Sequence, residues 1–211
     1  RLLELEILRA SHSSDQSFLD VHSLLHLNVD QFYGIEIEEF PAQIAQVALW
    51  LMDHQMNLLV SEEFGLYFVR IPLQTSSTIV CGNALAIDWK TVVSPWSVSY
   101  IMGNPPFVGK KEQTSEQKKE VVGIFNDVKG NGVLDYVTCW YKLAIRQMKS
   151  NENIKAAFVS TNSIVQGEQV CVWGNWMRSQ GAEIFFAHRT FQWSNEARGK
   201  AAVHCVIIGF S

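Results

Sequence analysis

The segment Asn104-Pro105-Pro106-Phe107 has the residue types best suited to chemistry, and it directly follows the strand-like stretch SYIMG. Ligands of parallel sheets bind beyond the carboxyl ends of the strands. Two prolines fix the backbone there and remove two N–H donors, so the segment offers acceptors: the Asn104 side-chain oxygen and the Pro105 carbonyl. Such a pair suits a planar amino group on an aromatic ring, with Phe107 stacked on the base. Drawing the two hydrogens out of the ring plane would localise the nitrogen lone pair for attack. The alternative is a tight turn with a proline stop.

A second candidate is Glu36, at the end of the strand-like stretch DQFYGIEI and directly before a helix. A carboxylate in that position can accept hydrogen bonds from ribose hydroxyls. The neighbouring Ile37 could cover the face of a bound adenine. Glu38 and Glu39 are better suited to the first turn of the helix, where negative charge is favoured.

Two further segments allow a functional and a structural interpretation. Asn83 follows the strand-like stretch STIV and could bond the edge of an adenine, whereas Gly-Asn is equally a turn chosen for its backbone angles. The stretch from Thr190 to Asn195 is expected to be a loop. Its aromatic residues Phe191 and Trp193 could line a pocket for an extruded base or pack on a sheet edge.

Strands alternate with helices along the chain, which predicts an α/β fold with a mainly parallel sheet flanked by helices. Only the stretch TFQWSNEARGK joins the last two strands, so an antiparallel pair is expected at the end of the sheet. The expected strands are 30–37, 64–72, 77–80, 98–103, 154–161, 182–189 and 201–210, and the expected helices are 1–10, 18–27, 41–57, 131–148 and 169–181.

Charge is unevenly distributed between the two halves of the chain. Residues 1–100 carry 4 Lys/Arg and 12 Asp/Glu, a balance of −8, whereas residues 101–211 carry 13 and 9, a balance of +4. The second half could therefore present a phosphate-facing side, with Lys110 and Lys111 as backbone contacts. Two ordinary solvated faces are the alternative. Residues 108–130, rich in Lys, Glu and Gln, are expected to be an inserted mobile loop with some helix, outside the core.

Composition excludes several classes. No run approaches ~18 apolar residues, so a membrane-spanning helix is not expected. The four cysteines lie far apart without a C-x-x-C pair, which indicates reduced thiols in a cytoplasmic protein. None follows a proline, as the nucleophile of cytosine C5 methylation does, and the H-x-E and P-C-x-x-C motifs of zinc deaminases are absent. His22 and His26 have metal-ligand spacing but no third ligand nearby, so no metal site is predicted.

In this order along the chain, Glu36, Gly82-Asn83, Asn104–Phe107 and Phe191 with Trp193 resemble the amino-methyltransferases of DNA. The closer resemblance is to the methyltransferase segment of MmeI-like restriction–modification proteins. It is carried by GNPPFVGKKEQ, LDYVTCWYKLA and FAHRTFQWSN and spans nearly the whole chain. The resemblance implies a Rossmann-like, class I methyltransferase that moves a methyl group from S-adenosyl-L-methionine to the N6 atom of an adenine flipped out of double-stranded DNA.

The resemblance also implies roles for individual residues. It puts Glu36 on the cofactor ribose and Asn83 near its adenine. It puts Asn104 and Pro105 on the target amino group, with Phe107 stacked on the base. Asp135 falls in a segment that helps to shape the target-base pocket, and it could equally cap the helix that follows.

The chain departs from the family in two respects. No Gly-rich cofactor loop precedes Gly34, and Asn83 stands where Asp is common. The chain also begins at Arg1 without an initiator Met. We therefore expect 1–211 to be a single methyltransferase-like domain, truncated at its N-terminus, with the cofactor loop upstream. The expected partners are target-recognition and nuclease domains of the same parent chain, and the fragment could form a homodimer.

Two alternatives remain open. An Asn-Pro-Pro-aromatic segment also suits an RNA base or a glutamine side-chain amide as methyl acceptor. A methyltransferase-like domain without its cofactor loop could instead be a non-catalytic DNA-binding module.

Overall fold

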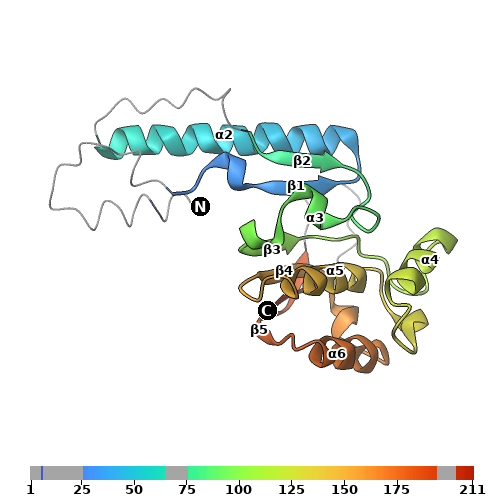
Figure 1. Ribbon diagram of the computed structural model, residues 1–211. Coiled ribbons are helices and arrows are strands. Elements are labelled where there is room, and N and C mark those ends of the chain that lie inside the picture. Colours follow the sequence, from blue (N-terminus) through green and yellow to red (C-terminus); the bar gives the residue numbers. More distant parts are fainter. Residues whose placement is uncertain (1–5, 7–25, 65–75, 194–202) are drawn as a thin grey trace. The chain divides into compact units, whose positions relative to one another are not determined.

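The computed structural model describes residues 6, 26–64, 76–193 and 203–211. The chain divides into two compact units, residues 1–88 (unit 1) and 89–211 (unit 2), each with its own strands and helices (Figure 1). Within the described ranges, no helix combines the length and the apolar character needed to cross a membrane. The expected helices 1–10 and 18–27 and the expected strand 64–72 lie almost entirely outside the described residues.

The described part of unit 1 contains a short parallel strand pair and a long helix. The strands β1 (Tyr33–Glu36) and β2 (Thr78–Cys81) pair in parallel. The helix α2 (Glu39–Phe64) lies between the two strands in the sequence, and a short 3-10 turn, η2 (Val29–Gln31), precedes β1. The predicted helix 41–57 is confirmed and is longer at both ends. Its proline falls in the first turn, where no N–H partner is lost.

The helix α2 has one buried side and one exposed side. Ala42, Met56 and Val60 are buried in unit 1, and the Asn57 amide donates to the buried Asp53 carboxylate at 3.1 Å. On the exposed side, apolar residues recur every three or four positions from Phe40 through Ile44 and Val47 to Leu51, and Leu58 follows seven positions later. The helix is therefore apolar on more surface than the strand pair covers.

Unit 2 contains a four-stranded sheet in the order β3-β4-β6-β5. β3 (Tyr100–Gly103) is parallel to β4 (Lys155–Thr161), and β6 (Val203–Phe210) is antiparallel to both β4 and β5 (Ile184–Trp193). The predicted antiparallel pairing of the last two strands is confirmed. The remaining elements are α3 (Trp89–Val92), η3 (Pro95–Ser97), α4 (Ser115–Ile124), η4 (Asn131–Val133), α5 (Thr138–Met148), η5 (Asn162–Val165) and α6 (Gln169–Ser179).

An aromatic cluster forms the core of unit 2. Tyr141 of α5 stacks on Phe210 with ring centroids 5.0 Å apart and meets Phe158 edge-on at 5.2 Å. Trp173 of α6 completes the group at 5.4 Å. All four side chains are buried. The Tyr141 hydroxyl lies 2.9 Å from the Ser160 hydroxyl, so its polar end is paired inside the core.

The segment 108–130 differs from the expectation of a loop outside the core. It contains α4, whose N-terminus is closed by a capping box between Thr114 and Gln117. Val121, Ile124 and Phe125 are buried. These three residues follow helical spacing, but the surrounding charges hid the pattern in the sequence. The mobility of the segment stays a prediction.

Candidate functional site

In unit 2, the turn Asn104–Phe107 leaves the carboxyl end of β3. Gly103 is paired with Phe158 of β4, and a Cβ atom at Gly103 would lie 3.2 Å from the Phe158 ring, closer than side chains normally pack. The absence of a side chain at Gly103 therefore allows the end of β3 to pack closely against the Phe158 ring. Pro105 is buried, whereas the Asn104 side chain is exposed and Phe107 is half-buried. The buried proline anchors the turn and leaves the amide of Asn104 accessible.

The residues after the turn are tied to the start of the segment that leads into α5. The Val108 carbonyl accepts from the Tyr136 N–H at 3.0 Å. The Lys110 N–H donates to Asp135 Oδ1, also at 3.0 Å. Asp135 is only 4% exposed. Its carboxylate binds Lys110, Ser163 and Gln169, and its side chain does not cap α5.

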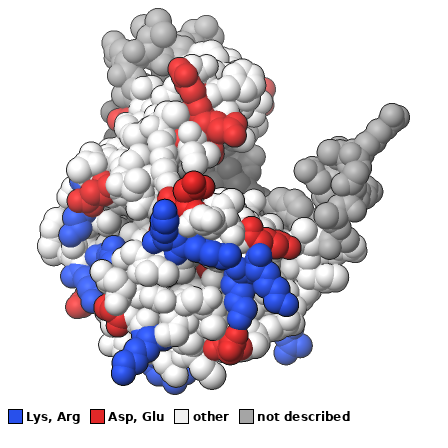
Figure 2. Space-filling view, turned by 90° about the vertical axis from the view of Figure 1, so that its right-hand side faces the viewer, with Lys and Arg blue, Asp and Glu red and all other residues white. Residues whose placement is uncertain are grey.

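The two lysines predicted to contact a phosphate backbone differ in their surroundings. Lys111 is exposed, whereas Lys110 is half-buried and its ammonium pairs with Glu168. On the side of the molecule shown in Figure 2, Lys and Arg side chains are interspersed with Asp and Glu side chains. The contact of Lys110 and Lys111 with a phosphate backbone stays a prediction.

The prediction that Thr190–Asn195 is a loop is wrong for its first four residues. The strand β5 continues to Trp193, with Phe191 opposite Cys205 and Trp193 opposite Val203 of β6. Phe191 is half-buried and meets the His188 ring edge-on, with centroids 5.3 Å apart. The ladder with β6 continues because both segments are rich in β-branched and aromatic residues, which favour strands. The role of Phe191 and Trp193 in a base pocket stays a prediction.

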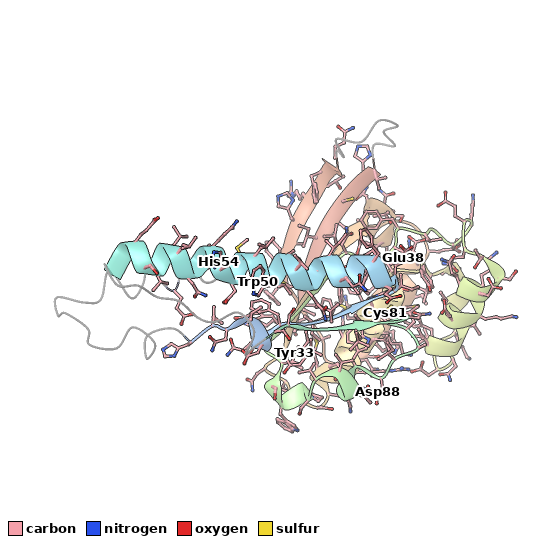
Figure 3. The ribbon with its side chains drawn as sticks, turned by 90° about the horizontal axis from the view of Figure 1, so that it is seen from above. Tyr33, Glu38, Trp50, His54, Cys81 and Asp88 are labelled. Atoms are coloured by element: carbon pink, nitrogen blue, oxygen red, sulfur yellow. The ribbon has the colours of Figure 1, made fainter. Side chains whose placement is uncertain are left out.

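In unit 1, the predicted cofactor residues lie at the carboxyl ends of two paired strands. Glu36 is opposite Cys81, and the Glu36 carbonyl accepts from the Gly82 N–H at 2.8 Å. Figure 3 shows Glu38 and Cys81 near one end of the strand pair and Tyr33 at the other. Glu36 Oε1 accepts from the Ile37 N–H at 2.9 Å, while the Ile37 side chain is exposed. A half-buried carboxylate next to an exposed apolar side chain is chemically suited to a nucleoside.

Asn83 takes part in a turn, as its structural interpretation predicted. Its side-chain oxygen accepts from the Leu85 N–H at 2.9 Å, and its carbonyl accepts from the N–H groups of Ala86 and Ile87. The preceding residue, Gly82, has a φ of 157°, a backbone conformation that favours glycine. The turn accounts for the Gly-Asn pair, and the contact of Asn83 with a cofactor adenine stays a prediction.

Glu36, Ile37 and Asn83 belong to unit 1, whereas Asn104–Phe107 and Asp135 belong to unit 2. Sequence reasoning missed Ser163 and Gln169, the side-chain partners of Asp135. No local pattern marks them, because Gln169 is one polar residue at the start of a helix and its partner lies 34 positions away.

Burial raises the pKa of two side chains of unit 2, Cys139 and Tyr136. It raises the pKa of the Cys139 thiol to about 12, so this cysteine is protonated at neutral pH. The pKa of Tyr136 is raised by burial and by a hydrogen bond from its hydroxyl to Glu120. Among the described residues, no group of three or more His, Cys, Asp or Glu could hold a metal ion. His22 lies outside those residues.

Comparison with known proteins identifies the class. The family model of the DNA-methyltransferase domain of MmeI matches residues 1–211. The structure of the type IIL restriction–modification enzyme MmeI in complex with DNA has 56% sequence identity and a TM-score of 0.89, over 99% of this chain and 28% of that one. A modification subunit of a putative type I restriction enzyme from Vibrio vulnificus shares the fold, with 15% identity and a TM-score of 0.50 over 96% of this chain and 37% of that one.

A curated relative, DNA methyltransferase A of Bacillus subtilis, is 40% identical over 214 residues, covering 100% of this chain and 24% of the relative. The predicted Rossmann-like methyltransferase fold is confirmed, and the chain belongs to the MmeI DNA-methyltransferase domain family. It spans about a quarter of the length of these relatives.

Proposed function

We propose that this chain is the methyltransferase part of a restriction–modification protein and transfers a methyl group from S-adenosyl-L-methionine to adenine N6 in DNA. The observation that carries the proposal is the turn after β3. It presents the exposed amide of Asn104 beside the buried Pro105, at the carboxyl end of a strand that is parallel to its neighbour. Membership of the MmeI domain family supports the methyltransferase class and DNA as the substrate.

The chain's own residues act mainly by positioning. Asn104 Oδ1 and the Pro105 carbonyl accept the two N–H hydrogens of the exocyclic amine, which leaves the nitrogen lone pair directed out of the ring plane. Phe107 stacks on the extruded base. The nitrogen needs no covalent link to the protein, so catalysis consists of orientation and polarisation. Extrusion of the base from the duplex costs a few kcal/mol, which protein contacts with the base offset.

Glu36 and Ile37 fit the nucleoside end of the cofactor. The half-buried Glu36 carboxylate would accept from ribose hydroxyls, and the exposed Ile37 would cover the adenine ring. Asn83 would meet the adenine edge. When bound, S-adenosyl-L-methionine supplies an electrophilic methyl group on a sulfonium.

The DNA side of the proposal involves residues from two places in unit 2. Phe191 and Trp193 of β5 would line the base pocket, and Lys110 and Lys111 would contact the phosphates. The chain covers only 28% of the DNA-bound MmeI chain, so we place target recognition, and any DNA cleavage, in other parts of the full-length protein.

The test is Asn104→Ala in the full-length protein. We expect the rate of methyl transfer from labelled cofactor to duplex DNA to fall by about a hundredfold or more, because the amine loses an acceptor that orients it. The matched control is Asn126→Ala, another exposed asparagine of unit 2, which should keep the wild-type rate. Normal turnover in Asn104→Ala would refute the role of this turn. Assays with RNA and with a glutamine-containing peptide would identify a different acceptor.

A further inference from the structure

We propose that Gln169 is a positioning residue for methyl transfer, acting through Asp135 on the segment that follows the Asn104–Phe107 turn. The inference rests on the proposed function, because Gln169 would help to maintain the geometry of the turn that is proposed to hold the target amine. The hydrogen bonds of the Gln169 side chain are to Asp135 and Ser163, so its proposed effect on the turn passes through Asp135 and Lys110.

First, two hydrogen bonds link the residues after the turn to Asp135 and Tyr136. The Lys110 N–H donates to Asp135 Oδ1 at 3.0 Å, and the neighbouring Tyr136 N–H donates to the Val108 carbonyl at 3.0 Å. The backbone between Val108 and Lys110 is thereby held at both ends. Only Phe107 separates this held segment from the two prolines, so a shift at Asp135 reaches the turn through a short, stiff stretch.

The second step is the link from Asp135 to Gln169. Gln169 Nε2 donates to Asp135 Oδ2 at 2.8 Å, and Gln169 Oε1 accepts from the Asp135 N–H at 3.0 Å. The amide thus grips both the carboxylate and the backbone of Asp135. Gln169 is 6% exposed and Asp135 is 4% exposed, so water cannot readily replace either bond.

The third step connects this pair to the end of β4. The Ser163 hydroxyl donates to Asp135 Oδ2 at 2.5 Å, and the Ser163 carbonyl accepts from Gln169 Nε2 at 2.7 Å. Ser163 lies in η5, two residues beyond the last residue of β4. These hydrogen bonds therefore link the segment that follows β3 to the segment that follows β4, at the carboxyl ends of both strands.

A second buried amide supplies a matched control at the other end of the same strands. Asn151 is 7% exposed, and its Nδ2 donates to the carbonyls of Pro95 and Val98 at 3.0 and 3.2 Å. It fastens the chain before β3 to the chain before β4. Loss of either amide should destabilise unit 2 to a similar extent, but only Gln169 lies on the side of the turn.

The experiment measures single-turnover methyl transfer and DNA affinity in the full-length protein. Gln169→Glu replaces a donor by an acceptor and sets two carboxylates side by side. We expect the rate at saturating DNA and cofactor to fall at least tenfold, while the Kd for DNA changes less than threefold. Asn151→Leu should lower the melting temperature comparably and keep the wild-type rate well below that temperature. An unchanged rate in a folded Gln169→Glu variant would overturn the inference.

A double variant keeps the test decisive. In Asp135→Asn with Gln169→Glu, the Asn amide donates to the Glu carboxylate, which restores this one hydrogen bond with reversed polarity, whereas the Ser163 carbonyl still loses its donor. We therefore expect the double variant to transfer methyl faster than Gln169→Glu and more slowly than wild type, because paired partners are strongly non-additive. A folded double variant as slow as Gln169→Glu would overturn the pairing. Asn104→Ala in the same assay separates the two claims: if it is slow while Gln169→Glu is normal, only the positioning inference fails.

Discussion

The two units hold their candidate site residues in different ways. In unit 1, Glu36 and Asn83 each direct a side-chain oxygen to a backbone N–H one or two residues further along the chain. In unit 2, the segment after the Asn104 turn is held by Asp135, which lies 25 positions beyond Lys110, and Asp135 is held by Gln169, 34 positions further on. Local hydrogen bonds orient the side chains of the first site, although its two strands pair and the Gly82 N–H bonds to the Glu36 carbonyl. Long-range hydrogen bonds of side chains hold the second site.

The cores of the two units differ in the same sense. The buried aromatic residues of unit 2 pack against one another from α5, α6, β4 and β6. Among the described residues of unit 1, the buried apolar side chains are Val29, Ala42, Met56 and Val60, and much of α2 is exposed. We therefore expect distant substitutions to affect the site turn in unit 2, whereas only substitutions at the strand ends should affect the site in unit 1.

The largest effect that would test this comparison is expected from Phe158→Ala. Phe158 is 1% exposed, packs on Tyr141 and supports Gly103 at the start of the turn. Truncation of a buried Phe typically costs about 3–5 kcal/mol, and we expect that loss in the free energy of unfolding measured by denaturation. The exposed Val165→Ala should change it by less than about 0.5 kcal/mol. A loss below about 1 kcal/mol for Phe158→Ala would contradict a single packed core in unit 2.

A smaller effect is expected from Glu36→Ala in unit 1. Hydrogen bonds to a charged group contribute about 1.5–3 kcal/mol, so the Kd for S-adenosyl-L-methionine should rise by about ten- to a hundredfold in calorimetry on the full-length protein. The rate at saturating cofactor should stay near wild type, because Glu36 is proposed to bind the ribose and not the transferred methyl group. Glu39→Ala, an exposed acid in the first turn of α2, should bind normally. Equal weakening in both variants would point to a general loss of negative charge.

The smallest effect is expected from Asp127→Asn in unit 2. The hydrogen bond from Lys142 is the main reason why the pKa of Asp127 lies below its usual value of 3.8. The ammonium of Lys142 also lies 4.7 Å from the centroid of the Phe125 ring, which lessens the loss. Because Asp127 is exposed, we expect a stability loss of about 1 kcal/mol at neutral pH.

The pH dependence of this pair follows from the direction of the shift. A carboxylate whose pKa is lowered by folding stabilises the folded state above its usual pKa, and the contribution disappears as the pH falls through the lowered value. The stability difference between wild type and Asp127→Asn should therefore be constant near neutrality and vanish in acid. Denaturation curves across that range check this, and a difference that grows in acid would contradict the assignment.

Much of the fold could be predicted because strand and helix patterns are local. The strand before Asn104 and the antiparallel last pair follow from short apolar stretches and the length of their connection. The end of β5 could not be placed, since Phe191 and Trp193 are compatible with a loop or a strand until β6 lies beside them. The core role of α4 was hidden by the charged residues around Val121, Ile124 and Phe125.

The sequence by itself determined that hydrogen-bond acceptors stand at the carboxyl ends of predicted strands. Proline removes donors and fixes the backbone wherever it stands, and a carboxylate before a helix keeps its chemistry in any fold. The tertiary structure alone decided that the Asp135 carboxylate is buried and accepts hydrogen bonds from Lys110, Ser163 and Gln169. Hydrogen bonds between residues distant in the chain depend on how β3 and β4 pair, and no periodicity in the sequence encodes that distance.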